Sequence, residues 1–343
     1  MKFNNVVIED YGLYLPEEKI SSEKMEELLS PIYKRLKLPQ GRLELMTGIK
    51  ERGVWPSGTL PSDLSANAAR DLFNKGNVNK DDIDLLIHSS VCRNFLEPST
   101  ASIVHGNLEL NDECTIFDLS NACLGMVNSW VVAANMIESG QIKKALIVSG
   151  ENGGPLLEET IKRLNEDETI TRKSIKKYFA NLTIGSAAVA YVLTHKDLCP
   201  NGHKLVSGAV MTDSTANKLC QGDGDPNSLF METDSEKLLE HGKKLAKNTW
   251  AKAKQRLDWT EKEIDLVIGH QVGKAHKEIV LGELNLNKRP TFDTFPFLGN
   301  TGSAALPVTL ALKNDREGIQ KGQKIVLVGI GSGLSSIVLG VEW

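Results

Sequence analysis

The segment IDLLIHSS at residues 83–90 returns as IDLVIGHQ at residues 264–271. In the same order, ALIVSGENGG from Ala145 returns as KIVLVGIGSG from Lys324. Both pairs are separated by about 180 residues, roughly half of the chain. Any one pair of apolar strands could match by chance, but a shared offset and order indicate an internal duplication. The alternation of strand-like and helical stretches around these segments is typical of an α/β protein.

The duplication predicts two similar βαβ-rich halves packed into one body. We place these halves at residues 1–174 and 175–343, although no Pro/Gly/Ser-rich linker marks the boundary. Residues 155–180 are charged and have helical periodicity. Because charged runs usually form solvated faces, we expect this stretch to be a helical excursion of the first half that overlaps the boundary.

Composition excludes several classes of protein. With a formal net charge of −4 and basic residues scattered among acidic ones, the chain lacks the electrostatic footprint of a nucleic-acid-binding protein. No window approaches the ~20 apolar residues of a membrane span, and MKFNNVVIEDYG at the amino terminus lacks the apolar core of a signal peptide. The five cysteines have no CxxC spacing, so we expect neither a disulfide framework nor a metal site. Free thiols are typical of the cytoplasm, which is the expected location.

One cysteine lies at a junction of two predicted elements. In FDLSNACLGMVNSW, residues 117–130, Cys123 follows a short strand and precedes apolar residues at helical spacing. The unpaired N–H groups and the dipole of a helix amino terminus favour the thiolate, the nucleophilic form of cysteine. A buried structural cysteine is the alternative, and position alone does not decide between the two.

The second half places two more polar groups at comparable junctions. His270 lies just beyond the strand in VIGHQVG, and Asn300 lies in the glycine-flanked turn of FPFLGNTGSAALP. Each signal is weak alone, because lone histidines are often core residues and Asn-Gly turns are common. If the halves superpose, however, both groups and Cys123 meet at the carboxyl ends of central strands, where α/β sheets place their sites. A thiol, an imidazole and a carboxamide are the groups that acyl transfer requires.

The order of these motifs resembles the thiolase superfamily. Cys123 in NACLG, His270 in GHQV, Asn300 in GNTGSAALP and a closing GIGSGL together resemble its β-ketoacyl-acyl-carrier-protein synthase III group. TGIKERG at residues 47–53 and IGSAAVAYVL at residues 184–193 also resemble recurrent segments of that group. The resemblance runs nearly end to end. It implies the thiolase fold, a duplicated five-layer αβαβα architecture, in a homodimer.

The resemblance also implies an acyltransferase mechanism in two stages. Cys123 takes an acyl group from a coenzyme A thioester, and the acyl-cysteine then undergoes Claisen condensation with a second thioester. His270 and Asn300 would stabilise the enolate of that second thioester. The backbone N–H groups of Cys123 and Ser332 would hold the oxyanion on the acylated cysteine. No permanently bound cofactor is implied, because coenzyme A thioesters are the substrates.

Contacts to coenzyme A follow the family pattern only in part. Thr47 and Arg52 of TGIKERG match it and are the expected substrate-binding residues. Arg42, however, stands where the synthases often carry a tryptophan that stacks on adenine, and Met46 stands where they carry an arginine. Gly273 completes HQVG where the synthases commonly have HQAN. These departures put the coenzyme contacts in doubt.

Glu97 bears on which second substrate the enzyme is expected to use. LEPSTASIV, which contains it, resembles the OleA-type branch of condensing enzymes, in which this glutamate reaches across the dimer interface and acts as the base on a second acyl-CoA. The chemistry is consistent, because a malonyl donor forms its carbanion by losing carbon dioxide whereas an unactivated acyl-CoA needs a base. The alternative is a β-ketoacyl synthase III that condenses acyl-CoA with malonyl-acyl-carrier protein to initiate fatty acid synthesis. Glu97 would then be a surface carboxylate and the carrier protein a partner.

Three other classes of protein fit the sequence less well. The G-x-G in VGIGSGL suggests a dinucleotide-binding oxidoreductase, but only ten residues follow Gly333, and they alternate like a strand. A non-enzymatic thiolase-fold subunit would be expected to lack the nucleophile, which is present here. A cysteine hydrolase would leave the turn at Asn300 unexplained.

Overall fold

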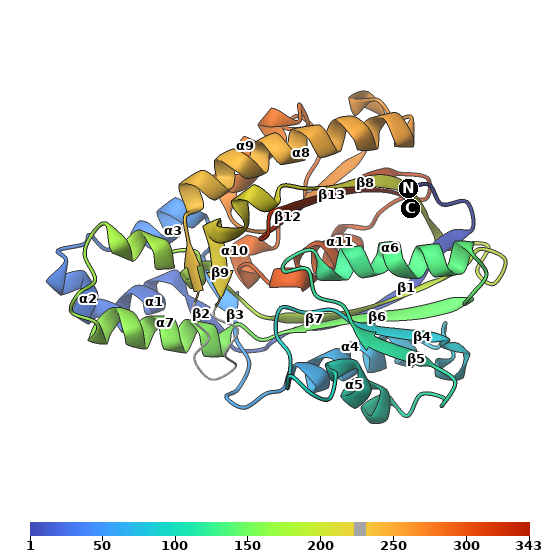
Figure 1. Cartoon of the computed structure of the whole chain (residues 1–343), viewed down its shortest axis with the longest axis horizontal. Coiled ribbons are helices and arrows are strands. Elements are labelled where there is room, and N and C mark those ends of the chain that lie inside the picture. The colour runs from blue at the N-terminus through green and yellow to red at the C-terminus, as the bar shows by residue number, and fades with distance from the viewer. Residues whose placement is uncertain (223–230) are drawn as a thin grey trace.

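The computed structural model describes residues 1–222 and 231–343 and shows two layers of strands connected at one place (Figure 1). The strands follow the order β11-β12-β13-β8-β1-β7-β6-β4-β5. Only Val7 and Ile8 of β1 pair with β8, so the order separates into a first sheet that ends in β1 and a second that ends in β8. The strands of these sheets are β1 (Val6–Tyr14), β4 (Leu85–His88), β5 (Thr115–Asp118), β6 (Lys144–Glu151), β7 (Ala187–His195), β8 (His203–Thr212), β11 (Leu266–Gly269), β12 (Lys324–Gly331) and β13 (Ser335–Glu342).

Helices complete five layers, which confirms the predicted αβαβα fold (Figure 1). Helices α4 (Pro61–Asn74) and α5 (Thr100–Leu108) cover the outer face of the first sheet, and α8 (Ser235–Leu257) and α9 (Lys274–Glu283) cover that of the second. Helices α6 (Gly125–Glu138) and α11 (Ala305–Glu317) lie between the sheets and contact each other. The middle helices are apolar over most of their circumference, as helices enclosed on both sides must be.

The duplication read from the sequence is visible in the strand pairing. β4 runs parallel to β6, which is antiparallel to β7, and β7 is antiparallel to β1. β11, β12, β13 and β8 repeat these relations in the same order. A parallel bridge between Val267 and Thr291 takes the place that β5 has beside β4. Although β7 lies beyond residue 174, it extends the first sheet; the division at residues 174 and 175 stays a prediction.

Smaller elements gather at one end of the molecule, on the left of Figure 1. There α1 (Ser22–Leu28), α2 (Ser30–Arg35), α3 (Arg42–Thr47) and α7 (Gly154–Glu166) enclose a separate apolar cluster. The predicted excursion at residues 155–180 therefore buries one face, including Leu157 and Leu164, and leaves its charged residues on the other. The remaining short elements are β2 (Lys19–Ser21), β3 (Glu51–Gly53), β9 (Cys220–Gly222), β10 (Met231–Thr233), α10 (Phe295–Leu298), η1 (Lys80–Asp82), η2 (Ser174–Tyr178), η3 (Asn181–Thr183), η4 (Ser214–Leu219), η5 (Glu261–Glu263) and η6 (Gly302–Ala304).

A membrane-crossing helix would need more length and apolarity than any helix in the described part of the chain possesses.

Candidate active site

Cys123 lies in a tight turn between β5 and α6. Ala122 has a positive φ of 46°, and the N–H of Leu124 donates to the carbonyl of Asn121 at 3.0 Å. Helix α6 begins at Gly125, two residues after the cysteine rather than at it. A side chain at position 125 would meet the Oγ of Ser89 at 2.5 Å, so only glycine fits beside the thiol. As a whole residue Cys123 is partly exposed, although its thiol group is buried.

The ionisation state of Cys123 differs from the sequence-based expectation. Burial of the thiol, with smaller contributions from Cys220 and the carboxyl group of Glu151, raises its pKa to about 12. The helix dipole was expected to favour the thiolate. Because the helix starts beyond the cysteine, desolvation of the buried thiol outweighs the dipole. We therefore expect a neutral thiol at physiological pH.

His270 lies one residue beyond the end of β11, at the edge of the second sheet. Its main-chain N–H donates to the carbonyl of Val328 at 2.9 Å and so extends the pairing with β12. The side chain is buried, and its Nδ1 has no hydrogen-bond partner among the described residues. Burial, with nearby His276 adding to it, lowers the pKa of His270 to about 3. The imidazole is therefore neutral at physiological pH.

Gln271 holds the loop that follows His270, and sequence analysis did not identify it. Its side chain is 1% exposed, and its Nε2 donates to the carbonyl of Gly269 at 2.7 Å. Its Oε1 accepts from the N–H groups of Thr294 and Phe295 at 2.8 and 3.1 Å. Gln271 thereby connects the end of β11 to the start of α10, from which the chain continues to Asn300. The HQ pair in the sequence was the available signal.

Asn300 is buried in a turn held by the segment that leads into β7. Its N–H donates to the carbonyl of Thr183 at 2.8 Å, and its carbonyl accepts from the N–H of Gly185 at 2.9 Å. A Cβ at Gly185 would lie 1.8 Å from the carbonyl oxygen of Leu298, so this approach requires glycine. The side-chain Oδ1 accepts from the N–H of Gly302 at 3.2 Å, which fixes the orientation of the carboxamide.

Ser303 connects the Asn300 turn to the cysteine turn. Its Oγ accepts a hydrogen bond from the N–H of Met126 at 2.9 Å, in the first turn of α6, and donates to the carbonyl of Ser89 at 2.8 Å. The carboxyl end of β4, the first turn of α6 and the turn before α11 are thus bonded together. The structure therefore brings the junctions of Cys123 and Asn300 to the same place.

The GIGSGL loop also lies against the cysteine turn. A Cβ at Gly331 would lie 2.9 Å from the Cγ of Leu124, and one at Gly329 would lie 2.5 Å from a Leu124 methyl group. Ser332 follows directly in the connection between β12 and β13 and is partly exposed. Glycine at positions 329 and 331 is what lets this strand approach the residue after Cys123.

Glu97 lies on the exposed loop between β4 and α5. Neighbouring Phe95 and Leu96 are 51% and 78% exposed, an unusual amount for large apolar side chains. Within the described part of the chain, no hydrogen bond or ion pair joins Glu97 to Cys123, His270 or Asn300. One chain alone does not connect this carboxylate to the other predicted groups.

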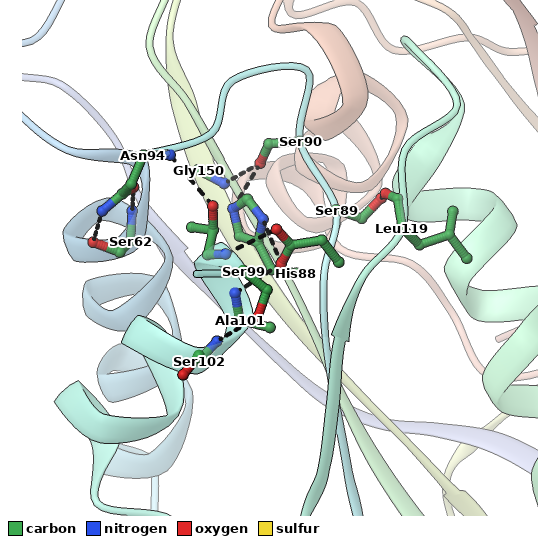
Figure 2. A network of polar contacts seen from close by, with 12 residues as sticks. Ser62, His88, Ser89, Ser90, Asn94, Ser99, Ala101, Ser102, Leu119 and Gly150 are labelled. Atoms are coloured by element: carbon green, nitrogen blue, oxygen red, sulfur yellow. Dashed lines mark hydrogen bonds and ion pairs between the residues drawn. The ribbon is translucent and has the colours of Figure 1, made fainter. Parts of the chain in front are cut away.

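A buried polar network holds the root of that loop (Figure 2). The Nε2 of His88 lies 3.2 Å from the Oγ of Ser90, and its Nδ1 lies 3.7 Å from a carboxylate oxygen of Asp118. Ser90 also accepts from the N–H of Gly150 at 2.8 Å, and Asp118 accepts from that of Thr100, at the start of α5, at 2.8 Å. The order Ser–His–Asp is that of a hydrolase, but His88 is 2% and Ser90 8% exposed. The network is therefore structural and holds the start of the loop in place.

The two expected coenzyme contacts have different surroundings. Thr47, at the end of α3, is half-buried, and its Oγ1 donates to the carbonyl of Leu43 at 2.6 Å. Arg52 is completely buried and donates to the Oγ of Ser22 and the carbonyl of Ile20 at 3.0 and 3.3 Å. These internal partners give Arg52 a structural role and no route to a ligand in solution.

Gly273 in HQVG explains one departure from the family pattern. A Cβ there would lie 2.8 Å from the carbonyl oxygen of Thr47, and the residue has a φ of 155°. The end of α3 therefore packs directly on the loop after His270. Arg42 and Met46 are both exposed on α3. No cluster of three or more potential metal ligands occurs among the described residues.

Comparisons with known proteins agree with this geometry. The family model described as 3-oxoacyl-[acyl-carrier-protein] synthase III C terminal matches residues 255–343, and the 3-oxoacyl-[acyl-carrier-protein] synthase III model matches residues 117–167. The acyl-CoA:acyl-CoA alkyltransferases of Xanthomonas campestris and Shewanella oneidensis are 36% and 34% identical to this chain over the full length of both proteins. A β-ketoacyl-[acyl-carrier-protein] synthase III of Clostridium novyi is 27% identical over 99% of each.

Solved structures of OleA are also similar to this chain over nearly its full length. Cerulenin-bound OleA from Xanthomonas campestris superposes with a TM-score of 0.95 at 36% identity, covering 100% of this chain and 98% of that one. A cysteine-to-serine variant of the same protein, with bound lauric acid and lauroyl-CoA, superposes with a TM-score of 0.94 at 35% identity, covering 99% and 100%.

Proposed function

Because the chain belongs to the acyl-CoA:acyl-CoA alkyltransferase family, we propose that it joins two acyl-CoA molecules by Claisen condensation and forms a β-keto acyl product. The chain is a condensing acyltransferase that works without a permanently bound cofactor. The observation that carries the choice of substrate is Glu97, which stands in the motif LEPSTAS on an exposed loop. It supplies the base that an unactivated acyl-CoA requires.

In the first stage, the sulfur of Cys123 attacks the thioester carbonyl and coenzyme A leaves as the thiol. The N–H groups of Cys123 and Ser332 hold the oxyanion of the tetrahedral intermediate. Since the resting thiol is neutral, its proton has to move as the carbon–sulfur bond forms. His270 is neutral and has a ring nitrogen without a partner among the described residues, so it is the proposed relay that carries this proton to the departing sulfur in concert with carbon–sulfur bond formation.

In the second stage, Glu97 removes the α-proton of the second acyl-CoA. His270 and Asn300 donate hydrogen bonds to the thioester oxygen on which the enolate charge develops. The enolate carbon then attacks the acyl-cysteine carbonyl, and the sulfur of Cys123 leaves as the thiolate. Glu97 releases the α-proton to solvent, and the thiolate takes up a proton to restore the neutral thiol. Hydrogen-bond donors of this kind contribute about 3 kcal/mol each when the site excludes water. Thr47 remains the proposed contact to the coenzyme, at the end of α3.

A second copy of this chain is the proposed partner of the exposed loop. Val91, Phe95 and Leu96 present large apolar surfaces around Glu97, and contiguous exposed apolar patches mark interaction sites. A homodimer would cover them and deliver each Glu97 to the neighbouring site, where Cys123 of the partner lies. The free cysteines support a cytoplasmic location for such a dimer.

The donor requirement tests the reaction. The protein is incubated with lauroyl-CoA alone, and the protein and the small molecules are weighed by mass spectrometry. We expect an acyl adduct on Cys123 that is absent from the Cys123→Ser variant, followed by a β-keto product. Product that forms only when malonyl-acyl-carrier protein is added, with Glu97→Ala fully active, would establish the initiating synthase instead.

Mixed dimers test whether Glu97 acts across the interface. Co-expression of Glu97→Ala and Cys123→Ser chains with different tags gives a dimer in which one site combines the intact cysteine of one chain with the intact glutamate of the other. We expect both homodimers to be inactive in condensation and the mixed dimer to recover up to about half of the wild-type rate. An inactive mixed dimer would place Glu97 in the site of its own chain.

A further inference from the structure

Glu151 is a buried carboxylate that the proposed mechanism does not use. It is the last residue of β6 and is 3% exposed. In the described part of the chain it has no ion pair with a lysine, arginine or histidine. Its side chain accepts hydrogen bonds from three backbone N–H groups, those of Val91, Cys92 and Ser303. Burying a carboxylate without a cation is costly, so these three donors have to compensate for the lost water.

The three donors come from two segments that are far apart in the sequence. Val91 and Cys92, whose N–H nitrogens lie 2.8 and 3.3 Å from the carboxylate, are at the start of the loop that carries Glu97. Ser303, at 2.9 Å, lies in the turn that carries Asn300. One carboxylate oxygen accepts from both Val91 and Ser303, so a shift of either segment disturbs the other.

The same carboxylate is connected through Ser303 to the segment that carries the nucleophile. A Cβ at Gly302 would lie 2.9 Å from its Oε1, and Ser303 bonds in turn to Met126 in the helix that follows Cys123. The negative charge contributes to the raised pKa of the Cys123 thiol. Burial also raises the pKa of Glu151 itself, against the effect of the three N–H donors.

We propose that Glu151 is a positioning residue that fixes the Glu97 loop relative to the Asn300 turn. The proposal rests on the proposed function and extends it. In a dimer with Glu97 acting in trans, Glu151 connects the site of its own chain to the loop that serves the partner's site. Condensation uses groups from both segments, Glu97 and Asn300, whereas acylation uses neither. Glu151 would therefore affect condensation more than acylation.

Two variants separate position from charge. Glu151→Gln keeps the shape, removes the charge and turns one acceptor into a donor that faces the N–H of Cys92. We expect condensation to fall at least tenfold, the rate of Cys123 acylation by lauroyl-CoA to stay within threefold, and alkylation of Cys123 by iodoacetamide to begin at lower pH. Glu151→Asp keeps the charge but shortens the side chain, so condensation should fall while the alkylation profile stays in place.

Glu26→Gln is the matched control. Glu26 is also buried, 5% exposed, and its carboxylate accepts from the N–H groups of Gly41 and Leu43 at 2.5 and 2.8 Å in the smaller apolar cluster. This variant should lose stability without changing the alkylation profile or the ratio of the two rates.

The outcomes are distinguishable. If acylation and condensation fall together in both Glu151 variants, as in Glu26→Gln, the positioning proposal is overturned. If Glu151→Gln does not fold, Glu151→Asp decides: a selective loss of condensation supports the proposal, and an equal loss of both rates overturns it. A wild-type protein that never acylates Cys123 would contradict the proposed function and not this inference.

Discussion

His88 and His270 stand at the ends of equivalent strands and have different surroundings. His88 is the last residue of β4 and pairs across the sheet with Val148 of β6. In the second half, Gly269 occupies the corresponding place opposite Val328 of β12, so His270 is one residue further along. His88 is bonded to Ser90 and paired with Asp118, whereas the Nδ1 of His270 has no partner among the described residues.

The difference of one residue explains the contrast. Side chains alternate between the two faces of a strand, so a shift of one position moves a side chain to the opposite face. Leu86 packs in the outer cluster under α4, and His88, two residues on, continues that row. Ile268 packs in the central cluster with α6 and α11, and strand alternation predicts the same row for His270, which also lines a small cavity with His276 of α9. We therefore expect the position along the strand, more than residue type, to separate the structural imidazole from the proposed catalytic one.

The largest expected effect comes from removing the central imidazole. His270→Ala should lower the rate of condensation by about a hundredfold or more, because it removes a donor aimed at the developing enolate. At the equivalent strand end of the first half, His88→Ala should lower the free energy of unfolding by a few kcal/mol, since it leaves Ser90 and Asp118 without their buried partner. Its condensation rate per folded molecule should fall less than tenfold.

Rates of both variants are compared at 20 °C after the folded fraction has been measured by urea titration. Equal losses in the two variants, per folded molecule, would show that the faces of the strands do not separate the roles of the two histidines.

Moving the imidazole by one residue tests directly whether the face of the strand decides its role. The double variant Gly269→His with His270→Gly keeps an imidazole at the end of β11 but directs it toward the outer layer, as in β4. We expect it to be as deficient in condensation as His270→Ala, provided that circular dichroism shows the native fold. Recovery of more than about a tenth of the wild-type rate would mean that the loop after β11 adapts and that strand parity is not decisive.

Much of the architecture could be predicted from the sequence because the repeated segments are short and occur in the same order in both halves. The segments at residues 83–90 and 264–271 became β4 and β11, and the turns of Cys123 and Asn300 follow from glycines and strand ends. Such features depend on neighbours within a few residues, which a sequence displays directly.

Features that depend on distant contacts could not be predicted. Glu151 ends a buried strand, and nothing near it in the sequence indicates that Ser303 and Val91 bond to it. The neutral state of Cys123 depends on desolvation by surrounding residues, which the local helix signal does not report. Arg52 matched a family motif but proved completely buried, because the glycine-rich turn at Gly299 packs against its side chain.

The smallest expected effect concerns stability against acid. Burial lowers the pKa of His88 to about 4 and that of His270 to about 3, both below the ~6.5 of an exposed histidine. Between pH 6.5 and about 4 the unfolded chain therefore binds protons at these positions that the native chain does not. The free energy of unfolding should fall with decreasing pH in this window, by about 1.4 kcal/mol per pH unit for each histidine. Urea titrations at pH 7, 6 and 5 measure the slope.

His88→Asn should make that slope shallower by about 1.4 kcal/mol per pH unit, because one proton-binding difference is removed while His270 remains. The comparison uses the change of slope and not the absolute stability, so the general cost of the substitution cancels. A parallel pair of slopes would mean that His88 is already protonated in the native chain. The ion pair with Asp118, at 3.7 Å, would then outweigh burial, and the two strand ends would differ in charge as well as in direction.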